Sequence, residues 1–281
     1  MKILLTGAHG QLGKELYRKL RPYHSVFALG KEDLDITNKN EVEKRFSQIK
    51  PELILHAAAF TAVDKCEIER MKAFEVNGLG AGTVAIEASK IGAKMLYYSS
   101  DYVFDGNKKT PYQEDDKPNP QSIYGMSKLL GEQFVLNFNK GIIIRTSWLY
   151  GHDGKNFVKT MLKLAEDKKE VRVVDDQIGT PTYVPDLADL TIQLMDRGSS
   201  GIYHISNNGS CTWYEFAKAI FSEAGHNQEL VKATSTEEFG SLAPRPHYSI
   251  LGHNALINAK IKPLRPWEEA LKEFIRKEIS Q

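Results

Sequence analysis

The sequence predicts an α/β protein built on a doubly wound, Rossmann-like parallel sheet, with a smaller C-terminal part. Two observations predict this class. Short apolar runs rich in β-branched residues alternate with amphipathic segments along the first half of the chain, and three glycines separate the first run from the segment after it. Apolar runs of this length are typical of parallel strands that helices cover on both faces. Right-handed crossovers between such strands give a doubly wound sheet.

The first half of the chain supplies most of the expected sheet. Its apolar runs are short enough for strands, and the segments between them carry apolar residues at helical spacing. The second helix begins near Asp35 and Thr37, two residues that can cap a helix. The predicted strands are residues 2–6, 25–29, 52–56, 93–99 and 141–147, and the predicted helices are residues 11–21, 38–49, 69–90 and 123–139.

After Tyr150 the regular alternation is lost. We assign residues 1–150 to the sheet domain and residues 151–281 mainly to the smaller part, which re-enters the sheet domain near residues 175–205. The helices predicted here are residues 155–166, 186–197, 213–224 and 266–278, and the strands are residues 170–174 and 201–205.

The composition is that of an ordinary globular protein. The 281 residues are 41% hydrophobic and 26% charged, and 37 basic against 36 acidic residues leave a formal charge of +1. No field of one sign attracts nucleic acid or anionic lipid. The N-terminal apolar run is too short for a signal peptide, and no run approaches the roughly 18 residues of a membrane span. We therefore expect a cytoplasmic protein with no nucleic-acid or membrane partner.

Three glycines, Gly7, Gly10 and Gly13, lie between the first strand and the first helix. Glycine permits a tight turn there, lets backbone N–H groups approach a pyrophosphate, and lets the helix pack closely on the sheet. The GxxGxxG spacing is weak evidence alone, but its place between a strand and a helix is the required context. It predicts a dinucleotide site and makes residues 1–150 the dinucleotide-binding domain.

The end of the second strand bears on which dinucleotide binds. An acidic residue there would bind the ribose 2′-hydroxyl of NAD, but Gly30 and Lys31 occupy that place. Lys31 can pair with a 2′-phosphate, which favours NADPH, whereas a solvated surface lysine would leave NADH open. Asp35 and Ile36 are better placed to border the adenine ring.

A tyrosine and a lysine four residues apart, Tyr124 and Lys128, occur in the segment SIYGMSK. Chance supplies about one such match in a chain of this composition, so the spacing decides nothing by itself. A second match, Tyr214 and Lys218, lies in an apolar helical stripe and is predicted to be structural. The first pair instead follows a strand that ends at Ser100, where ligands bind in open parallel sheets.

These three residues suit the reduction of a ketone. Hydride addition leaves an alkoxide that must take a proton, and tyrosine, with a pKa of about 10, needs a nearby cation to stabilise its phenolate. We predict Ser100, Tyr124 and Lys128 as the catalytic residues. Ser100 would hold the carbonyl oxygen, Tyr124 would donate the proton, and Lys128 would supply the charge and bind the nicotinamide ribose.

Together with these motifs, the segments HAAAFTAVDKCE (56–67), SDYVFDG (100–106), RTSWLYG (145–151) and RPHYSILGHNAL (245–256) resemble the extended short-chain dehydrogenase/reductase family of nucleotide-sugar enzymes. More narrowly, the chain is similar over nearly its full length to that family's dTDP-4-dehydrorhamnose reductase branch. The resemblance implies NADPH-dependent reduction of the 4-keto group of dTDP-4-dehydro-L-rhamnose, for polysaccharide biosynthesis. Alternatives are another nucleotide-sugar epimerase or dehydratase of the family, and a non-catalytic NADP-binding regulatory subunit.

The resemblance also implies contacts. Alanines 57–59 would let the backbone follow the dinucleotide, and the loop at residues 61–67 would meet the sugar. The expected cofactor-binding residues are Gly7, His9, Gly10, Gln11, Leu12, Lys31, Asp35, Ile36, Ala57, Ala58, Ala59, Tyr124 and Lys128. The expected substrate-binding residues are Val63, Asp64, Ser100, Trp148 and Arg245, although Asp64 and Arg245 could be solvated and Trp148 could fill a core.

A metal is not expected. Some members of this branch are described as magnesium-linked dimers that use scattered glutamates. Glu15 is in a plausible place here, but Asp189 and Leu190 complete no ligand cluster. Cys66 and Cys211 also lack metal-ligand spacing and are expected to be small buried residues. The sequence does not decide whether the protein forms a homodimer.

Overall fold

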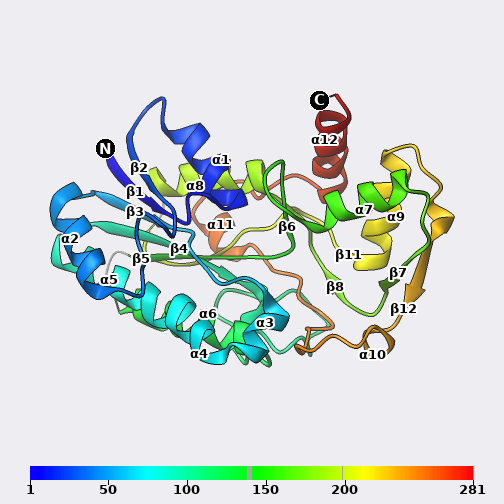
Figure 1. Ribbon diagram of the computed structural model, residues 1–281, viewed down its shortest axis with the longest axis horizontal. Coiled ribbons are helices and arrows are strands. Elements are labelled where there is room, and N and C mark those ends of the chain that lie inside the picture. The colour runs from blue at the N-terminus through cyan, green and yellow to red at the C-terminus, as the bar shows by residue number, and fades with distance from the viewer. Residues whose placement is uncertain (138–140, 198, 281) are drawn as a thin grey trace.

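The computed structural model describes residues 1–137, 141–197 and 199–280. Its centre is a six-stranded sheet in which every neighbouring pair is parallel, in the order β10-β5-β4-β3-β1-β2 (Figure 1). The predicted doubly wound sheet is therefore confirmed, with its topological switch point between β1 and β3. The strands are β1 (Lys2–Thr6), β2 (Ser25–Leu29), β3 (Leu53–His56), β4 (Lys94–Ser100), β5 (Gly141–Thr146) and β10 (Gly201–His204).

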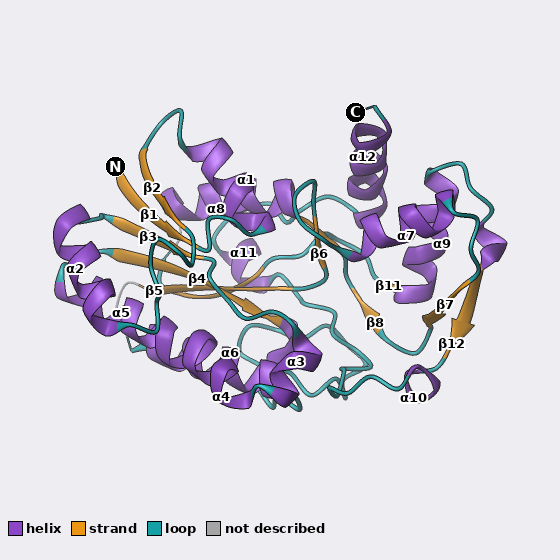
Figure 2. Ribbon diagram, in the orientation of Figure 1, coloured by secondary structure: helices purple, strands orange, loops and turns teal. Residues whose placement is uncertain are grey.

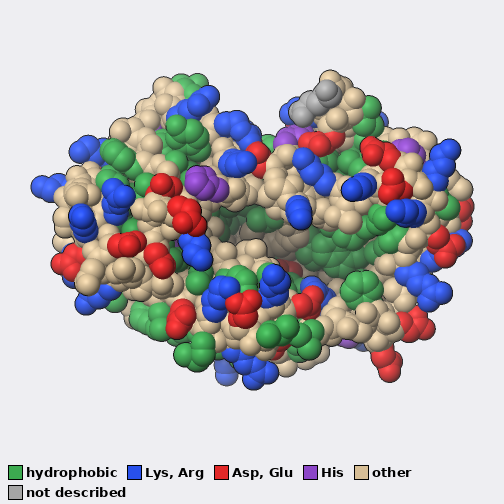
Figure 3. Space-filling model, in the orientation of Figure 1, with side chains coloured by type: hydrophobic (Ala, Val, Ile, Leu, Met, Phe, Trp, Pro, Cys, Tyr) green, Lys and Arg blue, Asp and Glu red, His purple; other side chains and the backbone are tan. Residues whose placement is uncertain are grey.

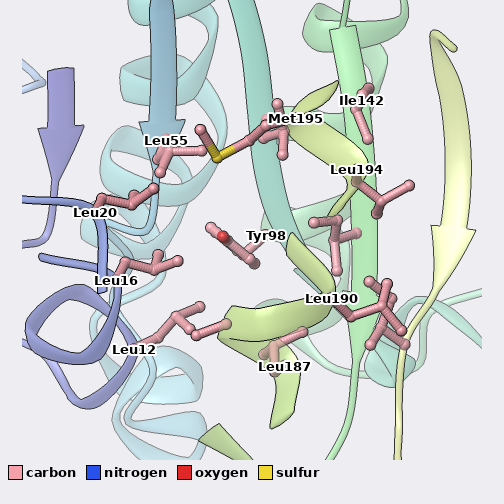
Figure 4. Packing of buried hydrophobic residues seen from close by; sticks show 14 of the residues in the cluster. Leu12, Leu16, Leu20, Leu55, Tyr98, Ile142, Leu187, Leu190, Leu194 and Met195 are labelled. Atoms are coloured by element: carbon pink, nitrogen blue, oxygen red, sulfur yellow. The ribbon is translucent and has the colours of Figure 1, made fainter. Parts of the chain in front are cut away.

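Helices cover both faces of this sheet, as the continuous apolar strands require. On one face, leucines of α1 and α8 pack on Leu55, Tyr98 and Ile142 of the strands (Figure 4). Fully burying a leucine stabilises the fold by about 2 kcal/mol, so this layer is a main source of stability. The helices of this face are α1 (Gln11–Leu20), α8 (Val184–Arg197) and α11 (Asn254–Asn258). Those of the other face are α2 (Lys39–Ile49), α5 (Ala81–Lys90) and α6 (Ile123–Leu136).

Several local predictions need correction. Asn38 caps α2 by accepting hydrogen bonds from Asn40 and Glu41, whereas Asp35 and Thr37 precede the cap. The segment predicted as one helix over residues 69–90 is broken into α4 (Arg70–Ala73), the π-helix η1 (Phe74–Gly80) and α5. A Cβ atom on Gly78 would lie 2.6 Å from the Leu130 side chain of α6. The lack of a side chain at Gly78 therefore allows η1 to pack closely against α6. The final positions of the helix predicted over 123–139 lie outside the described residues.

The segment after β3 also differs from its prediction. Residues expected to form a loop instead build a short helix, α3 (Val63–Ile68). Its Glu67 accepts a hydrogen bond from the backbone N–H of Ile123 at 2.8 Å, at the start of α6. The substrate-loop residues and the Tyr124 helix are thus joined by a contact that crosses 56 positions of sequence.

The C-terminal part has its own apolar core, which lies beside the sheet rather than on it (Figure 2). Tyr150, Phe216, Phe221 and Phe274 are buried there, and β7 pairs in parallel with β12. Both cysteines are free and buried. The elements are α7 (Phe157–Glu166), β7 (Val171–Val174), α9 (Trp213–Glu223), η3 (Gln228–Leu230), β12 (Val231–Thr234), α10 (Thr236–Phe239) and α12 (Trp267–Ile279). Short connecting strands are β6 (Leu149–Tyr150), β8 (Ile178–Gly179), β9 (Thr182–Tyr183) and β11 (Cys211–Thr212).

Within the described ranges, no helix combines the length and the apolar character of a membrane span. The strand β10, from the second half of the chain, forms an edge of the main sheet beside β5. The helix α8 before it packs on α1. The division of the chain at residue 150 into cofactor and substrate parts stays a prediction.

Candidate active site

The glycine turn after β1 is packed too tightly for side chains. Gly7 has φ +68°, and a Cβ atom on it would lie 2.5 Å from the backbone nitrogen of Ala58. A Cβ atom on Gly13 would lie 2.2 Å from the Gly7 carbonyl oxygen. Gly10 precedes α1 and donates its N–H to the Gly7 carbonyl at 3.0 Å. The turn therefore holds the N-terminus of α1 against β3, in the geometry of a phosphate-binding loop.

A cavity of about 280 Å³ opens beside this turn. It lies at the carboxyl ends of β1, β2 and β3, at the switch point of the sheet, where α/β proteins bind ligands. The lining residues are Thr6, Gly7, His9, Gly10, Gly30, Lys31, Leu34, Asp35, Ile36, Ala57, Ala58, Ala59 and Val76. Nine of the expected cofactor residues are thus brought together around one cavity.

Two expected cofactor residues lie differently. The Leu12 side chain is buried in the core between α1 and α8 and does not line the cavity. Gln11 accepts a hydrogen bond from Asn156 at 3.0 Å, which joins the start of α1 to the loop before α7.

The mouth of the cavity carries charge suited to an adenosine phosphate. Lys31 is exposed, and within the described residues it has no ion-pair partner. Asp35 accepts two hydrogen bonds from Thr37, through the backbone and the hydroxyl, and these hold the pKa of Asp35 below its usual value. Lys31 is therefore a cation available to a ligand phosphate, while Asp35 stays ionised behind it.

The strand end at Ser100 and the start of α6 meet as predicted. Ser122 caps α6 by accepting from the Gly125 N–H at 3.1 Å. A Cβ atom on Gly125 would lie 2.1 Å from the Tyr102 carbonyl oxygen, so this glycine allows α6 to approach the β4 end. Tyr124 is buried, and the Ser100 side chain is close enough to lower its pKa. Gly125, within the motif YGMSK, is a site residue that the sequence analysis missed.

The electrostatics of the pair differ from the expectation. Burial raises the pKa of Tyr124, the charge of Asp101 raises it further, and Lys128 does not lower it in this structure. Burial lowers the pKa of Lys128 to about 7, against an opposing effect of Glu132. The Lys128 ammonium lies 4.2 Å from the centre of the Tyr97 ring and, within the described residues, forms no hydrogen bond. Tyr124 is therefore held protonated, the form that a proton donor needs.

Asn77 is a second residue that the sequence analysis missed. It lies in η1, is 1% exposed, and its side chain binds the Phe60 N–H at 2.7 Å and the Phe60 carbonyl at 3.0 Å. It also donates to the Ser127 hydroxyl at 3.0 Å. Asn77 thus fixes the backbone after β3 relative to α6; an asparagine within a predicted helix was its only sequence signal.

Two expected substrate residues are bound to each other. Arg245 donates to the Asp64 carboxylate at 2.8 Å and to the Tyr102 hydroxyl at 3.0 Å. The Ala243 N–H donates to the same carboxylate at 3.0 Å. Val63, beside Asp64, packs in the small apolar cluster that contains Tyr124. Val63, Asp64 and Arg245 therefore lie near Tyr124, and the Arg245 guanidinium is paired with the Asp64 carboxylate.

Trp148 is held in an unusual conformation. Its φ is +46°, and its ring stacks on Trp213 with 3.7 Å between ring centres. A side chain at Gly179 would lie 2.7 Å from the Trp148 ring. A positive φ is rare for a bulky residue, and such strain is found at functional sites more often than elsewhere. The two tryptophans therefore form a fixed apolar wall.

A second cavity, of about 410 Å³, lies beside Trp213. Trp213 and Arg245 both line it, with apolar residues of α7 and β7. Figure 3 shows the hollow between the two parts of the molecule, with hydrophobic side chains along its C-terminal side. The lining residues are Phe157, Met161, Val171, Arg172, Val173, Val174, Gln177, Trp213, Phe239, Ser241 and Arg245.

The second tyrosine–lysine pair has the structural surroundings predicted for it. Tyr214 packs against the C-terminal core, and Lys218 lies 5.6 Å from its ring centre. Lys218 also pairs with Glu229 at 3.7 Å. Trp213, on the same helix, was expected in the core stripe but is only partly buried.

The acidic residues considered for a metal are paired with cations. Lys19 lies 2.7 Å from Asp189 and 3.8 Å from Glu15. Throughout the described part of the chain, no three His, Cys, Asp or Glu side chains gather as a ligand set.

Several known proteins similar to this chain are named as reductases. A family model described as the RmlD substrate binding domain matches residues 1–279. The spore coat polysaccharide biosynthesis protein SpsK of Bacillus subtilis (strain 168) is 50% identical, over 99% of this chain and 98% of that protein. A dTDP-4-dehydrorhamnose reductase of Aggregatibacter actinomycetemcomitans is 42% identical, over 97% and 98%. The crystal structure of a dTDP-4-dehydrorhamnose reductase from Bacillus anthracis str. Ames in complex with NADP superposes with a TM-score of 0.95, at 47% identity over 98% and 99% of the two chains.

Proposed function

The chain belongs to the RmlD substrate binding domain family, and on that premise we propose that it reduces the 4-keto group of dTDP-4-dehydro-L-rhamnose to dTDP-L-rhamnose with NADPH. The observation that carries the proposal is the approach of Tyr124, on α6, to Ser100 at the end of β4, with Lys128 buried one turn further along α6. A NADP-bound relative with the same fold supports the cofactor.

Each residue of the site has a task in this reaction. NADPH, when bound, supplies the hydride that adds to the carbonyl carbon. Tyr124 donates its proton to the oxygen that becomes the alcohol, and its raised pKa keeps that proton in place until the charge develops. Ser100 orients the ketone oxygen toward Tyr124. Lys128, buried one turn further along α6, would bind the ribose hydroxyls and, when charged, would offset the charge of the phenolate.

In this proposal the cofactor occupies the cavity beside the glycine turn, and the substrate lies on the side of Arg245, which lines the second cavity. The glycine turn suits a pyrophosphate, because a Cβ atom at Gly7 or Gly13 would fill the space that the backbone needs. Lys31 at the mouth would bind the 2′-phosphate and favour NADPH over NADH. Val63, Asp64, Trp148 and Arg245 would contact the sugar nucleotide, and Arg245 would exchange Asp64 for a phosphate.

Two alternative functions predict different results. An epimerase of the same fold returns its cofactor, and a dehydratase typically carries an Asp-Glu pair beside the strand end, which Ser99, Ser100 and Asp101 lack here. A regulatory subunit would bind NADPH without turnover, because a fold alone does not establish activity.

The test is stoichiometry. The purified protein is incubated with the 4-keto sugar nucleotide and NADPH, and separately with NADH, while absorbance and product are followed. We expect one NADPH oxidised for each dTDP-L-rhamnose formed, and slower oxidation of NADH. Epimerised product without net oxidation, or NADPH binding with no product, would refute the proposal. A role in polysaccharide biosynthesis, a cytoplasmic location and a homodimer are further predictions.

A further inference from the structure

Asp101 is a buried carboxylate that the mechanism above does not use. It follows Ser100 at the end of β4 and is 2% exposed. Its Oδ1 accepts a hydrogen bond from the Ser100 hydroxyl at 2.8 Å. Its Oδ2 is buried and, in the described part of the chain, completes no hydrogen bond. The Ser249 hydroxyl lies near enough to lower the pKa of Asp101 without completing one. A buried, half-paired carboxylate beside a reacting group needs an explanation.

The Ser100 hydroxyl has only one hydrogen to give. When Asp101 is ionised, Ser100 gives that hydrogen to the carboxylate and can only accept a hydrogen bond from Tyr124. When Asp101 is protonated, its own O–H can donate to the Ser100 oxygen instead. The Ser100 hydrogen is then free to point toward Tyr124 or the ketone oxygen.

The charge of Asp101 acts in the same direction. The titratable groups that face it are Tyr124 from α6 and its neighbour Tyr102, whose hydroxyl accepts from Arg245. The Asp101 charge raises the pKa of both tyrosines. Burial raises the pKa of Asp101 to about 6, against the opposing effects of the Ser100 hydrogen bond, the nearby Ser249 hydroxyl and the backbone N–H groups of Asp101 and Tyr102. Neutral Asp101 therefore makes Tyr124 a better proton donor.

We propose that Asp101 is a positioning residue whose protonation turns the Ser100 hydroxyl from Asp101 toward Tyr124 and the ketone, and so enables proton delivery. The inference rests on the reductase function proposed above. The proton balance closes: Tyr124 gives its proton to the new alcohol oxygen, the phenolate takes the Ser100 hydrogen, and Ser100 takes the Asp101 proton. Asp101 is left as a carboxylate, which regains a proton from solvent; each turnover consumes one proton with one hydride.

The test is the pH profile of Asp101→Asn. The amide cannot ionise, and its NH₂ group can donate to Ser100 as the protonated acid does. In the wild type, kcat should fall about tenfold per pH unit above the pKa of Asp101 in the complex. In Asp101→Asn this alkaline limb of the pH profile, the fall of kcat with rising pH, should disappear. The KM for the sugar nucleotide should change little. A variant slower by one constant factor, with the limb retained, would show a merely structural role and overturn the proposal.

Ser249→Ala provides a second variant, which leaves the Asp101 carboxyl group itself in place. Because the Ser249 hydroxyl lowers the pKa of Asp101, its removal should move the limb to higher pH. An unmoved limb would contradict the proposal, even if Asp101→Asn failed to fold.

The carboxyl can also be titrated without substrate. Carbon NMR should show one signal, absent in Asp101→Asn, that titrates well above the ordinary aspartate value. An ordinary pKa for that signal would overturn the inference whatever the substrate is. A wild type that titrates as expected but leaves the 4-keto sugar nucleotide unreduced would instead reject the proposed function.

Discussion

At the scale of single residues, Lys128 is a buried lysine whose charged form lowers the stability of the folded protein. The side chain is 1% exposed, and its ammonium has an aromatic ring as its neighbour rather than a carboxylate hydrogen bond. Burial lowers its pKa from the ordinary 10.5 to about 7, so the charged form is costly in the folded protein. A residue kept for packing alone would be apolar.

Replacing Lys128 by methionine should therefore stabilise the protein and abolish turnover. Near pH 7 the expected gain in the free energy of unfolding is on the order of 2 kcal/mol. Because the folded-state pKa is depressed, wild-type stability rises between pH 7 and 10.5, and the difference between the proteins shrinks there. Thermal unfolding across this range measures the effect.

Lys218→Met is the matched control, since Lys218 stands in the second tyrosine–lysine pair and is partly solvated. Lys218→Met should change neither the turnover nor the free energy of unfolding appreciably. A Lys128→Met protein that unfolds more easily than wild type at pH 7 would contradict the cost assigned to the buried ammonium.

Sequence could name Tyr124 and Lys128 but could not give their electrostatics. The motif and its position after a strand end predicted this pair, rather than Tyr214 and Lys218, as the site residues. The pKa of Tyr124 depends instead on burial and on Asp101, whose distance is set by the approach of α6 to β4. The Asp64–Arg245 pair, 181 positions apart, was likewise invisible as a pair.

At the scale of elements, two glycines of the turn between β1 and α1 have different roles: the fold requires Gly7, whereas Gly10 leaves space for a ligand. Gly7 has both a positive φ and backbone atoms within 3 Å of any added Cβ atom. Gly10 has φ −75°, and its added Cβ atom would approach only the Gly7 oxygen, at 3.3 Å. The first glycine is required by the fold, whereas the second leaves the helix N-terminus open to a phosphate.

Gly7→Ala should lower the free energy of unfolding by roughly 2 kcal/mol or more, because strain and overlap add. Gly10→Ala should unfold like wild type but bind NADPH more weakly. Denaturant unfolding and fluorescence titration measure the two effects.

Gly225→Ala separates the two causes, because Gly225 has φ +74° and an added Cβ atom there meets nothing within 4 Å. It should cost less than Gly7→Ala. Equal losses in the two variants would contradict the close-packing argument.

Periodicity predicted the elements where local sequence decides them. All five strands of the first half, and the helix α6 that carries Tyr124, lie where the apolar runs and the helical spacing predicted them. The π-helix η1 was not predictable, because it depends on Gly78 meeting Leu130 of another helix. The helix α3 was missed for a similar reason: its Glu67 is tied to the start of α6 by a contact distant in sequence.

At the scale of the molecule, two apolar cores meet along a hollow, and groups from both parts face it (Figure 3). The cavity beside β1 and β3 lies in the sheet part, whereas Trp213 and the 410 Å³ cavity belong to the C-terminal part. Asp64 and Arg245 join the two sides near Tyr124. In the proposed function, the cofactor would occupy the cavity of the sheet part, and the sugar nucleotide would lie toward the C-terminal part.

The most direct measurement of this account compares Tyr124→Phe with Tyr214→Phe in the oxidation of NADPH by the 4-keto sugar nucleotide. Tyr124→Phe should lose about 100-fold or more in kcat, because the proton donor is gone, while the protein still binds NADPH. Tyr214→Phe should keep wild-type turnover. A Tyr124→Phe protein that reduces the substrate at the wild-type rate would contradict the assignment of the active site.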